Sequence, residues 1–488
     1  MSVDQAAAGP RVTTLLRLAV TGGRADLMRI VLTVVGSAAA TVVLLTAATV
    51  ASVGPSDGPY GLEVLNEPGL RPGVMVVLLL LCVPILSFVG QCVRVGAPAR
   101  DRRLAAFRMA GGTPGDARAI VALETGLAAA AGAVVGAVVY AVLHATLRDP
   151  PAFPHPRSEV AFVVNVPGAP NLPTDVLPPW WLFVLACAAV PLGATAASLV
   201  ALRRITIGPF GVLHRVTHRP PALLPAVVFA IGAGGLILWS SIAQALGLTG
   251  EGIGVSGGVA LLLFVMAVVG LVFGSAAVAY QIGSWLAPRT GNPALLIASR
   301  RMVDAPFTAS RASSVVVLAV MLGSAVQGTR ANFLTITDPG EPFYRDTFTL
   351  LDVGLAVGLG VAVAGLLVIA AEGVIARRRT LASLAASGTP RHVLAGAIML
   401  ETVVPLVPAV LVASAAGLFA ARGFFGTSGS VQVGIGRHNV SQQVSVPVPW
   451  TELLTLVGGT LGAVCLVTAG ALVFLRSSTK ASELRASA

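Results

Sequence analysis

The chain alternates between long apolar runs and short polar segments. Because a helical span of a bilayer needs about 20 mostly apolar residues, each long run is a candidate transmembrane helix. With 55% hydrophobic and 11% charged residues over 488 positions, and a mean hydropathy of +0.87, a soluble multidomain protein is excluded. The sequence predicts an all-α polytopic membrane protein with about ten transmembrane helices, near residues 27–53, 73–96, 118–147, 179–202, 222–244, 257–284, 310–329, 348–376, 392–420 and 450–475.

One thirteen-residue segment occurs twice. RRLAAFRMAGGTP at 102–114 and RRTLASLAASGTP at 378–390 match at seven positions with a constant offset of 276. In each copy an arginine pair leads into a short amphipathic stretch, and a Gly-Thr-Pro follows it. Each copy therefore predicts a short helix that lies across the mouth of two spans and ends at residues that cannot continue it. The apolar residues of the two short helices are Leu104 and Phe107 in the first copy, and Leu381 and Leu384 in the second.

The repeat extends beyond this segment. An amphipathic lead-in precedes the first span, and PALLIASRRMVDAP at 293–306 similarly precedes the seventh. Spans 1–4 and 7–10 then form two equivalent four-helix units, and the two spans between them leave the units parallel. The predicted organisation is an N-terminal tail with an interfacial helix (1–26), a first repeat (27–204), spans 5 and 6 (205–290), a second repeat (291–476) and a tail (477–488).

Charge predicts the orientation. If the N-terminus is cytoplasmic, the inner segments hold most of the 32 lysines and arginines, as the positive-inside rule requires. Both termini and both Gly-Thr-Pro turns then face the cytoplasm of a bacterial plasma membrane. The net charge of +11 is a topological signal that also suits anionic membrane lipid, and nucleic acid is not an expected partner.

Two glutamates are placed inside predicted spans. Glu124 and Glu401 each precede a threonine and lie about two turns into spans 3 and 9. Because a carboxylate there is costly, each should face the bundle interior or pair with an arginine. A coupling or proton-linked site and a structural ion pair both remain possible for these glutamates. The other carboxylates near span ends are interpreted as interfacial, and they are Asp352, Glu372 and Glu452.

The outer loops, cysteines, histidines and glycines give weaker indications of structure and function. The loops at 148–178 and 421–449 are Pro-rich and Gly/Ser-rich, and neither is long enough for an independent core. All four cysteines lie within predicted spans, so no disulfide framework is expected, and His214 and His218 lack partners for a metal site. Close helix packing is expected from glycine pairs such as Gly132/Gly136, Gly270/Gly274, Gly354/Gly358 and Gly458/Gly462.

The repeated segments resemble the FtsX-like permeases, the membrane subunits of MacB-type (type VII) ABC transporters. That family has an arginine cluster, a Gly-Ala-Thr-like turn and a glutamate inside the next span. Two departures are present: Ser387 stands where the first copy has Gly111, and the large outer domain of many members is here a loop of about 19 residues. The resemblance implies ATPase-coupling roles for Arg102, Arg103, Leu104, Phe107, Gly111, Gly112 and Thr113, and for Arg377, Arg378, Arg379, Leu381, Leu384, Gly388 and Thr389. The apolar faces at Leu104 and Phe107 and at Leu381 and Leu384 are expected to dock in a groove of the ATPase.

The chain has no phosphate-binding loop of its own. A P-loop needs a Gly-Lys pair, and the single lysine, Lys480, follows a threonine. The resemblance therefore implies a non-enzymatic permease without a cofactor, with ATP bound by separate ABC ATPase subunits, two per chain. We expect export or extraction of a lipophilic or membrane-partitioned substrate. The alternatives are a secondary transporter and a regulatory scaffold that relays ATPase motion to an outer partner.

Overall fold

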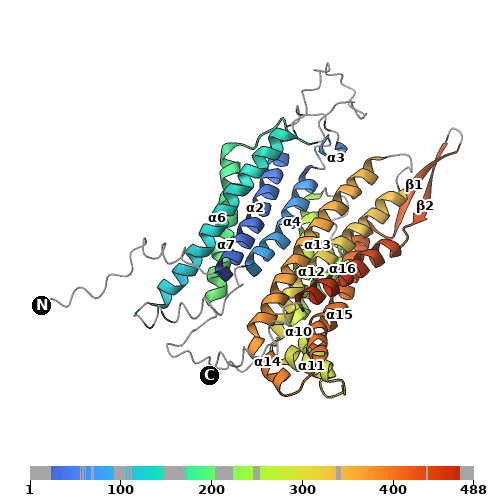
Figure 1. The fold of residues 1–488 in the computed structure, drawn as a ribbon. Helices are drawn as coiled ribbons and strands as arrows, with labels where there is room; N and C mark the ends of the chain where they lie inside the picture. The colour runs from blue at the N-terminus through green and yellow to red at the C-terminus, as the bar shows by residue number, and fades with distance from the viewer. Residues whose placement is uncertain are drawn as a thin grey trace. The chain divides into compact units, whose positions relative to one another are not determined.

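The chain folds as two compact units, Met1–Arg215 and Val216–Ala488, which are described separately. The computed structural model describes residues 24–54, 57, 60, 62–66, 71–92, 106, 109, 111, 113–147, 172–203, 224–245, 253–336, 342–435 and 438–472. Long helices make up nearly all of this part of the chain (Figure 1).

The first unit is built around its first long helix. Helix α2 packs against α4, α6 and α7, and α6 also packs against α7. The side chains of Leu45, Tyr140 and Ala186 form a buried cluster among these helices. At the end where α2 finishes, Arg71 donates to the backbone carbonyls of Val53, Gly54 and Leu65, which fixes the connection to α4. The helices are α2 (Arg24–Ser52), α3 (Glu63–Asn66), α4 (Arg71–Cys92), α6 (Pro114–Thr146) and α7 (Trp180–Arg203).

The second unit has its core between α12 and α15. The side chains of Val316, Met321, Leu366 and Val410 are almost fully buried there. Helices α8 and α10 pack against α15 and, for α10, against α12, so spans 5 and 6 belong to this unit. Its elements are α8 (Leu224–Ile237), α9 (Trp239–Ala245), α10 (Ile253–Leu286), α11 (Pro293–Asp304), α12 (Pro306–Ile336), α13 (Pro342–Ala376), α14 (Arg378–Ala386), α15 (Arg391–Phe425), β1 (Ser428–Ile435), β2 (His438–Ser445) and α16 (Trp450–Ala471).

The helix pairings of the two units follow one pattern. In the first unit α2 packs on α4, α6 and α7, and in the second α12 packs on α13, α15 and α16. The pairs α6–α7 and α15–α16 also correspond. The helices α2, α4, α6 and α7 thus match α12, α13, α15 and α16 in chain order and in contacts.

The protein is a multi-pass membrane protein. Within the described residues, seven helices are long and apolar enough to cross a membrane, and they are α2, α6, α10, α12, α13, α15 and α16. The other three predicted runs coincide with α4, α7 and the pair α8–α9. The run at 222–244, predicted as one helix, is interrupted at Leu238 between α8 and α9.

The loop at 421–449 contains a β-hairpin that the sequence analysis did not predict. Strands β1 and β2 pair antiparallel, with Val433 opposite Val440 and Ser428 opposite Ser445. At its base the backbone N–H of Val446 donates to the carbonyl of Thr427. The all-α prediction is therefore wrong for this segment. In Figure 1 the hairpin projects from one end of the second unit, whereas α11 and α14 lie at the other end.

Two glycines of α6 permit close contact with α2. A Cβ at Gly132 or Gly136 would collide with the backbone of α2 at Val34 or Ala38. Gly417 of α15 meets the backbone of α12 at Met321 in the same way. Among the described residues, a Cβ at Gly354, Gly458 or Gly462 would meet nothing within 4 Å, so these glycines show no close packing there.

We expect Gly132→Ala to destabilise the first unit by about 1–3 kcal/mol, because the added methyl group forces α2 and α6 apart. Gly458→Ala is the matched control, since its methyl group meets nothing within 4 Å and alanine favours a helix. Thermal unfolding in detergent measures both variants. Equal midpoints for the two would contradict the packing described.

Candidate functional site

The short helix α14 forms the turn between α13 and α15. It begins after Arg377, whose carbonyl accepts from the N–H of Leu381 at 2.9 Å. Leu381 is 1% exposed and packs with Val374, Leu394 and Ile398, while Leu384 is partly buried beside them. The apolar face of α14 is therefore held against α13 and α15 by the protein's own core.

The Gly-Thr-Pro sequence ends α14 as predicted. The N–H of Thr389 donates to the carbonyl of Leu384 at 3.0 Å, and the N–H of Gly388 donates to that of Ala385 at 3.2 Å. This is the Schellman pattern of helix ends, which needs a left-handed residue, and Gly388 supplies it with φ of +93°. Pro390 then sits in extended conformation as the N-cap of α15. The joint between α14 and α15 is therefore fixed by backbone geometry.

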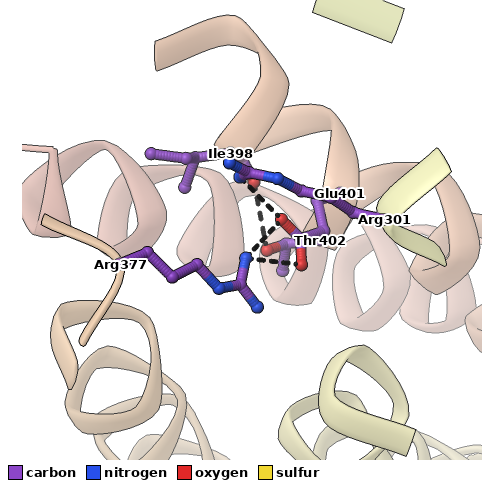
Figure 2. A network of polar contacts seen from close by, with 5 residues as sticks. All are labelled: Arg301, Arg377, Ile398, Glu401 and Thr402. Carbon is purple, nitrogen blue, oxygen red and sulfur yellow. Dashed lines mark hydrogen bonds and ion pairs between the residues drawn. The ribbon is translucent and has the colours of Figure 1, made fainter. Parts of the chain in front are cut away.

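Glu401 connects three elements at this end of the unit. Its side chain, on α15, is buried, and Nη1 of Arg377 donates to both carboxylate oxygens at 3.0 and 2.9 Å. Nη1 of Arg301, on α11, lies 3.4 Å from Oε2 (Figure 2). The ion pairs neutralise a carboxylate that would be costly to bury alone. They also tie the lead-in helix and the start of α14 to α15.

Glu124 of the first unit also pairs with an arginine. It lies on α6 with 5% exposure, and its Oε2 is 2.9 Å from Nη2 of Arg29 on α2. Arg29 is also buried, at 4% exposure. The expectation that both glutamates pair with arginine or face the interior is confirmed. Among the described contacts, the pair of the first copy joins two long helices, and those of the second copy join α15 to the turn and the lead-in helix.

The two copies are in register from their left-handed glycines onward. Gly111 has φ of +96°, like Gly388, and in each copy the buried glutamate follows thirteen residues later. The N-cap of the next long helix lies two residues after this glycine in each copy, at Thr113 and at Pro390. The constant offset of 276 paired Gly112 with Gly388, but the structural equivalent of Gly388 is Gly111. That offset aligned Ser387 with Gly111, but Ser387 lies one residue before Gly388, the left-handed glycine of the second copy.

Thr113 begins α6 with a capping box. Its hydroxyl accepts from the N–H of Asp116 at 3.2 Å, and the Asp116 carboxylate accepts from the N–H of Thr113 at 3.0 Å. Hydrogen bonds from the Thr113 hydroxyl and N–H lower the pKa of Asp116. The first copy thus secures the start of its helix with side chains, where the second uses proline.

The expected docking role of Leu381 and Leu384 is not supported by their positions. Both residues were expected to insert into an ATPase groove, but Leu381 is buried inside the permease and Leu384 packs beside it. An amphipathic nine-residue helix shows which residues share a face, yet not whether that face points to a partner or to its own bundle. The exposed face of α14 instead carries Thr380, Ser383, Ala386 and Ser387.

The other predicted coupling residues divide into described and undescribed positions. Gly111 and Thr113 are exposed, and Thr389 is half-buried. The side chains of Arg378 and Arg379 are not among those described, although both residues begin α14. Five further positions lie outside the described residues, namely Arg102, Arg103, Leu104, Phe107 and Gly112.

The arginines that reach the two glutamates from other helices were not predicted from the sequence. Arg29 lies two residues inside the predicted first span, and Arg301 lies on the predicted lead-in at 293–306. The available signal in the sequence was an arginine inside or just before one predicted span, together with a glutamate inside a later span with which it can pair. Asp352, interpreted as interfacial, is half-buried and accepts from Arg330 at 2.8 Å and from Gln327 at 2.7 Å.

Comparison with known proteins agrees with this geometry. The family model described as FtsX-like permease C-terminal matches residues 73–207 and 353–481, which together are more than half of the chain. The first match contains Gly111 and Glu124, and the second contains Gly388 and Glu401. No curated protein matches the chain. FtsX-like permeases are membrane transporter subunits that generally partner with ABC ATPases, and this chain belongs to the FtsX-like permease family.

Proposed function

We propose that this chain is the permease subunit of an ABC transporter and couples ATP hydrolysis by a separate ATPase to movement of a lipophilic or membrane-partitioned substrate. The observation that carries the proposal is the double family match, in which each match contains a left-handed glycine thirteen residues before a buried, ion-paired glutamate. The chain itself has no Gly-Lys pair to hold nucleotide phosphates. ATP is therefore bound by the partner, with one ATPase at each of the two turns.

The turn at α14 has the rigidity that coupling requires. Leu381 anchors it to α13 and α15, the Schellman end fixes its angle to α15, and Arg377 links its start to Glu401. A force applied to the exposed face of α14 would therefore move α13 and α15 with it. A loosely attached turn would absorb the same force by bending.

A secondary transporter fits the structure less well. Such a carrier needs an ion or substrate site near the midplane, built from broken helices or uncompensated charges. The two glutamates within the described spans α6 and α15 are each paired with an arginine, and each lies in the first half of its own helix. They serve helix packing and the turn, and they leave no open carboxylate there for proton coupling.

Co-purification tests the function directly. We expect the tagged permease to retain an ABC ATPase in mild detergent, and that complex to hydrolyse ATP faster when its lipophilic substrate is added. The permease alone should show no turnover, because it has no phosphate-binding lysine. Hydrolysis by a preparation free of any ATPase, or the absence of any ATPase partner, would refute the proposal.

The exposed face of α14 should determine ATPase binding. Ser383→Trp adds bulk to that face and should reduce ATPase co-purification at least about tenfold while leaving the unfolding midpoint unchanged. Leu381→Ala should instead lower stability by about 2–5 kcal/mol, because it empties a buried position. Full ATPase binding by Ser383→Trp would show that the partner docks elsewhere.

Orientation follows from the same assignment. In a cysteine-free background, Ser383→Cys at the α14 end should resist an impermeant thiol reagent in intact cells, and Gln443→Cys on the hairpin should react. Both positions are exposed and belong to the second unit, at the opposite ends seen in Figure 1. Labelling of Ser383→Cys alone would reverse the proposed topology, in which both termini lie in the cytoplasm of a bacterial plasma membrane.

A further inference from the structure

A pocket lies in the second unit at the end that carries the hairpin. It is formed by the last turns of α12, the segment between β2 and α16, and the first turn of α16. Its volume is about 400 Å³. The walls are mixed: Gln327, Arg330 and Glu452 contribute polar groups, and Leu334, Val448 and Trp450 contribute apolar surface. This combination suits a small amphiphilic molecule more than a purely apolar or purely polar one.

The pocket is placed at the boundary between membrane and water. Trp450 begins the membrane-spanning helix α16 and is 65% exposed. Tryptophan is enriched at the headgroup level of a bilayer, with its ring spanning the apolar and polar layers. A molecule in this pocket can therefore keep an apolar tail in the bilayer while its polar end reaches the protein.

The cation of the pocket is already balanced. Nη1 of Arg330 is 2.8 Å from Oδ2 of Asp352, and Nε2 of Gln327 donates to Oδ1 of the same carboxylate at 2.7 Å. Glu452 accepts from the Thr451 hydroxyl at 2.6 Å and forms no ion pair within the described residues. Arg330 also acts on Glu452, so one arginine is shared between two carboxylates. The net charge of this group is negative, which favours a cationic ligand over an anionic one.

An unused acceptor completes the site. Gln327 is 7% exposed, and among the described residues its Oε1 has no hydrogen-bond partner. Its Nε2 is fixed by Asp352, so the amide cannot turn its oxygen away without losing that bond. A buried acceptor of this kind is stabilised by any donor that reaches it. Gln327 lines the pocket with its Oε1 covered, so a ligand reaches that oxygen by displacing the side chains over it. Oε1 and the carboxylate of Glu452 then both call for N–H donors.

We propose that this pocket binds the polar end of an amphiphile that carries an N–H-bearing cation, a protonated amine, with its apolar tail against Trp450, Val448 and Leu334. The ammonium donates to Oε1 of Gln327 and to the carboxylate of Glu452. The source is either an amine-bearing lipid headgroup or an amine-bearing amphiphilic compound. The site is independent of the proposed ATPase coupling, because the permease alone should bind the ligand.

Two probes of equal charge and tail length test the proposal. Native mass spectrometry of the full chain in a neutral maltoside should show dodecylammonium binding roughly fivefold more tightly than dodecyltrimethylammonium, which has no N–H donor. Gln327→Met should remove this preference, and Glu452→Gln should weaken both probes. Gln443→Met, on the exposed hairpin, is the control and should change neither. Unfolding midpoints are measured for every variant.

Equal affinity for the two probes in the unaltered protein would overturn the proposal. Unchanged dodecylammonium binding in both Gln327→Met and Glu452→Gln would also overturn it, and because the two substitutions are on different helices, misfolding of one does not remove the test. Competition by lysophosphatidylethanolamine but not lysophosphatidylcholine supports the site and identifies a lipid headgroup as the source. Dodecylammonium binding with competition by neither supports the site for a non-lipid amine.

Discussion

Neutralising a carboxylate inside an apolar helix bundle is the constraint on which the turn region depends. Burying Glu401 within α15 is costly unless a cation reaches it, and Arg377 and Arg301 supply that charge. Arg377 also stands at the start of α14, so the electrostatic requirement fixes where the short helix begins. Since Arg301 belongs to α11, the same carboxylate holds the lead-in helix in place. One buried charge therefore links α15 both to the start of α14 and to α11, which is distant in sequence.

Rigidity of the turn comes from a second, independent source. The left-handed Gly388 and the two hydrogen bonds around it fix the angle between α14 and α15 through the backbone alone. Leu381 then anchors the middle of α14 in the core formed with Val374 and Leu394. With its start, middle and end each held by a different interaction, α14 moves only together with α13 and α15. This property makes it suitable for transmitting force, whichever protein applies that force.

Much of the fold could be predicted from apolar periodicity, because a membrane span must be long, helical and apolar throughout. The run at 27–53 corresponds to α2 (Arg24–Ser52), and the lead-in at 293–306 to α11 (Pro293–Asp304). The hairpin was not predicted because the glycines and serines around Val431, Val433 and Ile435 weaken the alternating apolar pattern of a strand. The inward orientation of Leu381 was not predicted for a different reason. In a helix of nine residues, an apolar face has the same sequence pattern whether it packs on its own bundle or docks on a partner. Tertiary contacts decide between these two orientations.

The two copies share this constraint, because their carboxylates stand at the same place after the turn. Glu124 of α6 and Glu401 of α15 each follow the left-handed glycine of their copy by thirteen residues. Both are buried, so each needs an arginine within reach. Among the described contacts, Arg29 of α2 reaches Glu124, whereas Arg301 of α11 and Arg377 before α14 reach Glu401. The position of the carboxylate follows from the repeated sequence, but the arginines that reach it are set by which helices pack against it. A repeat in sequence therefore predicts that such a glutamate is neutralised, and the tertiary contacts decide which residues do so.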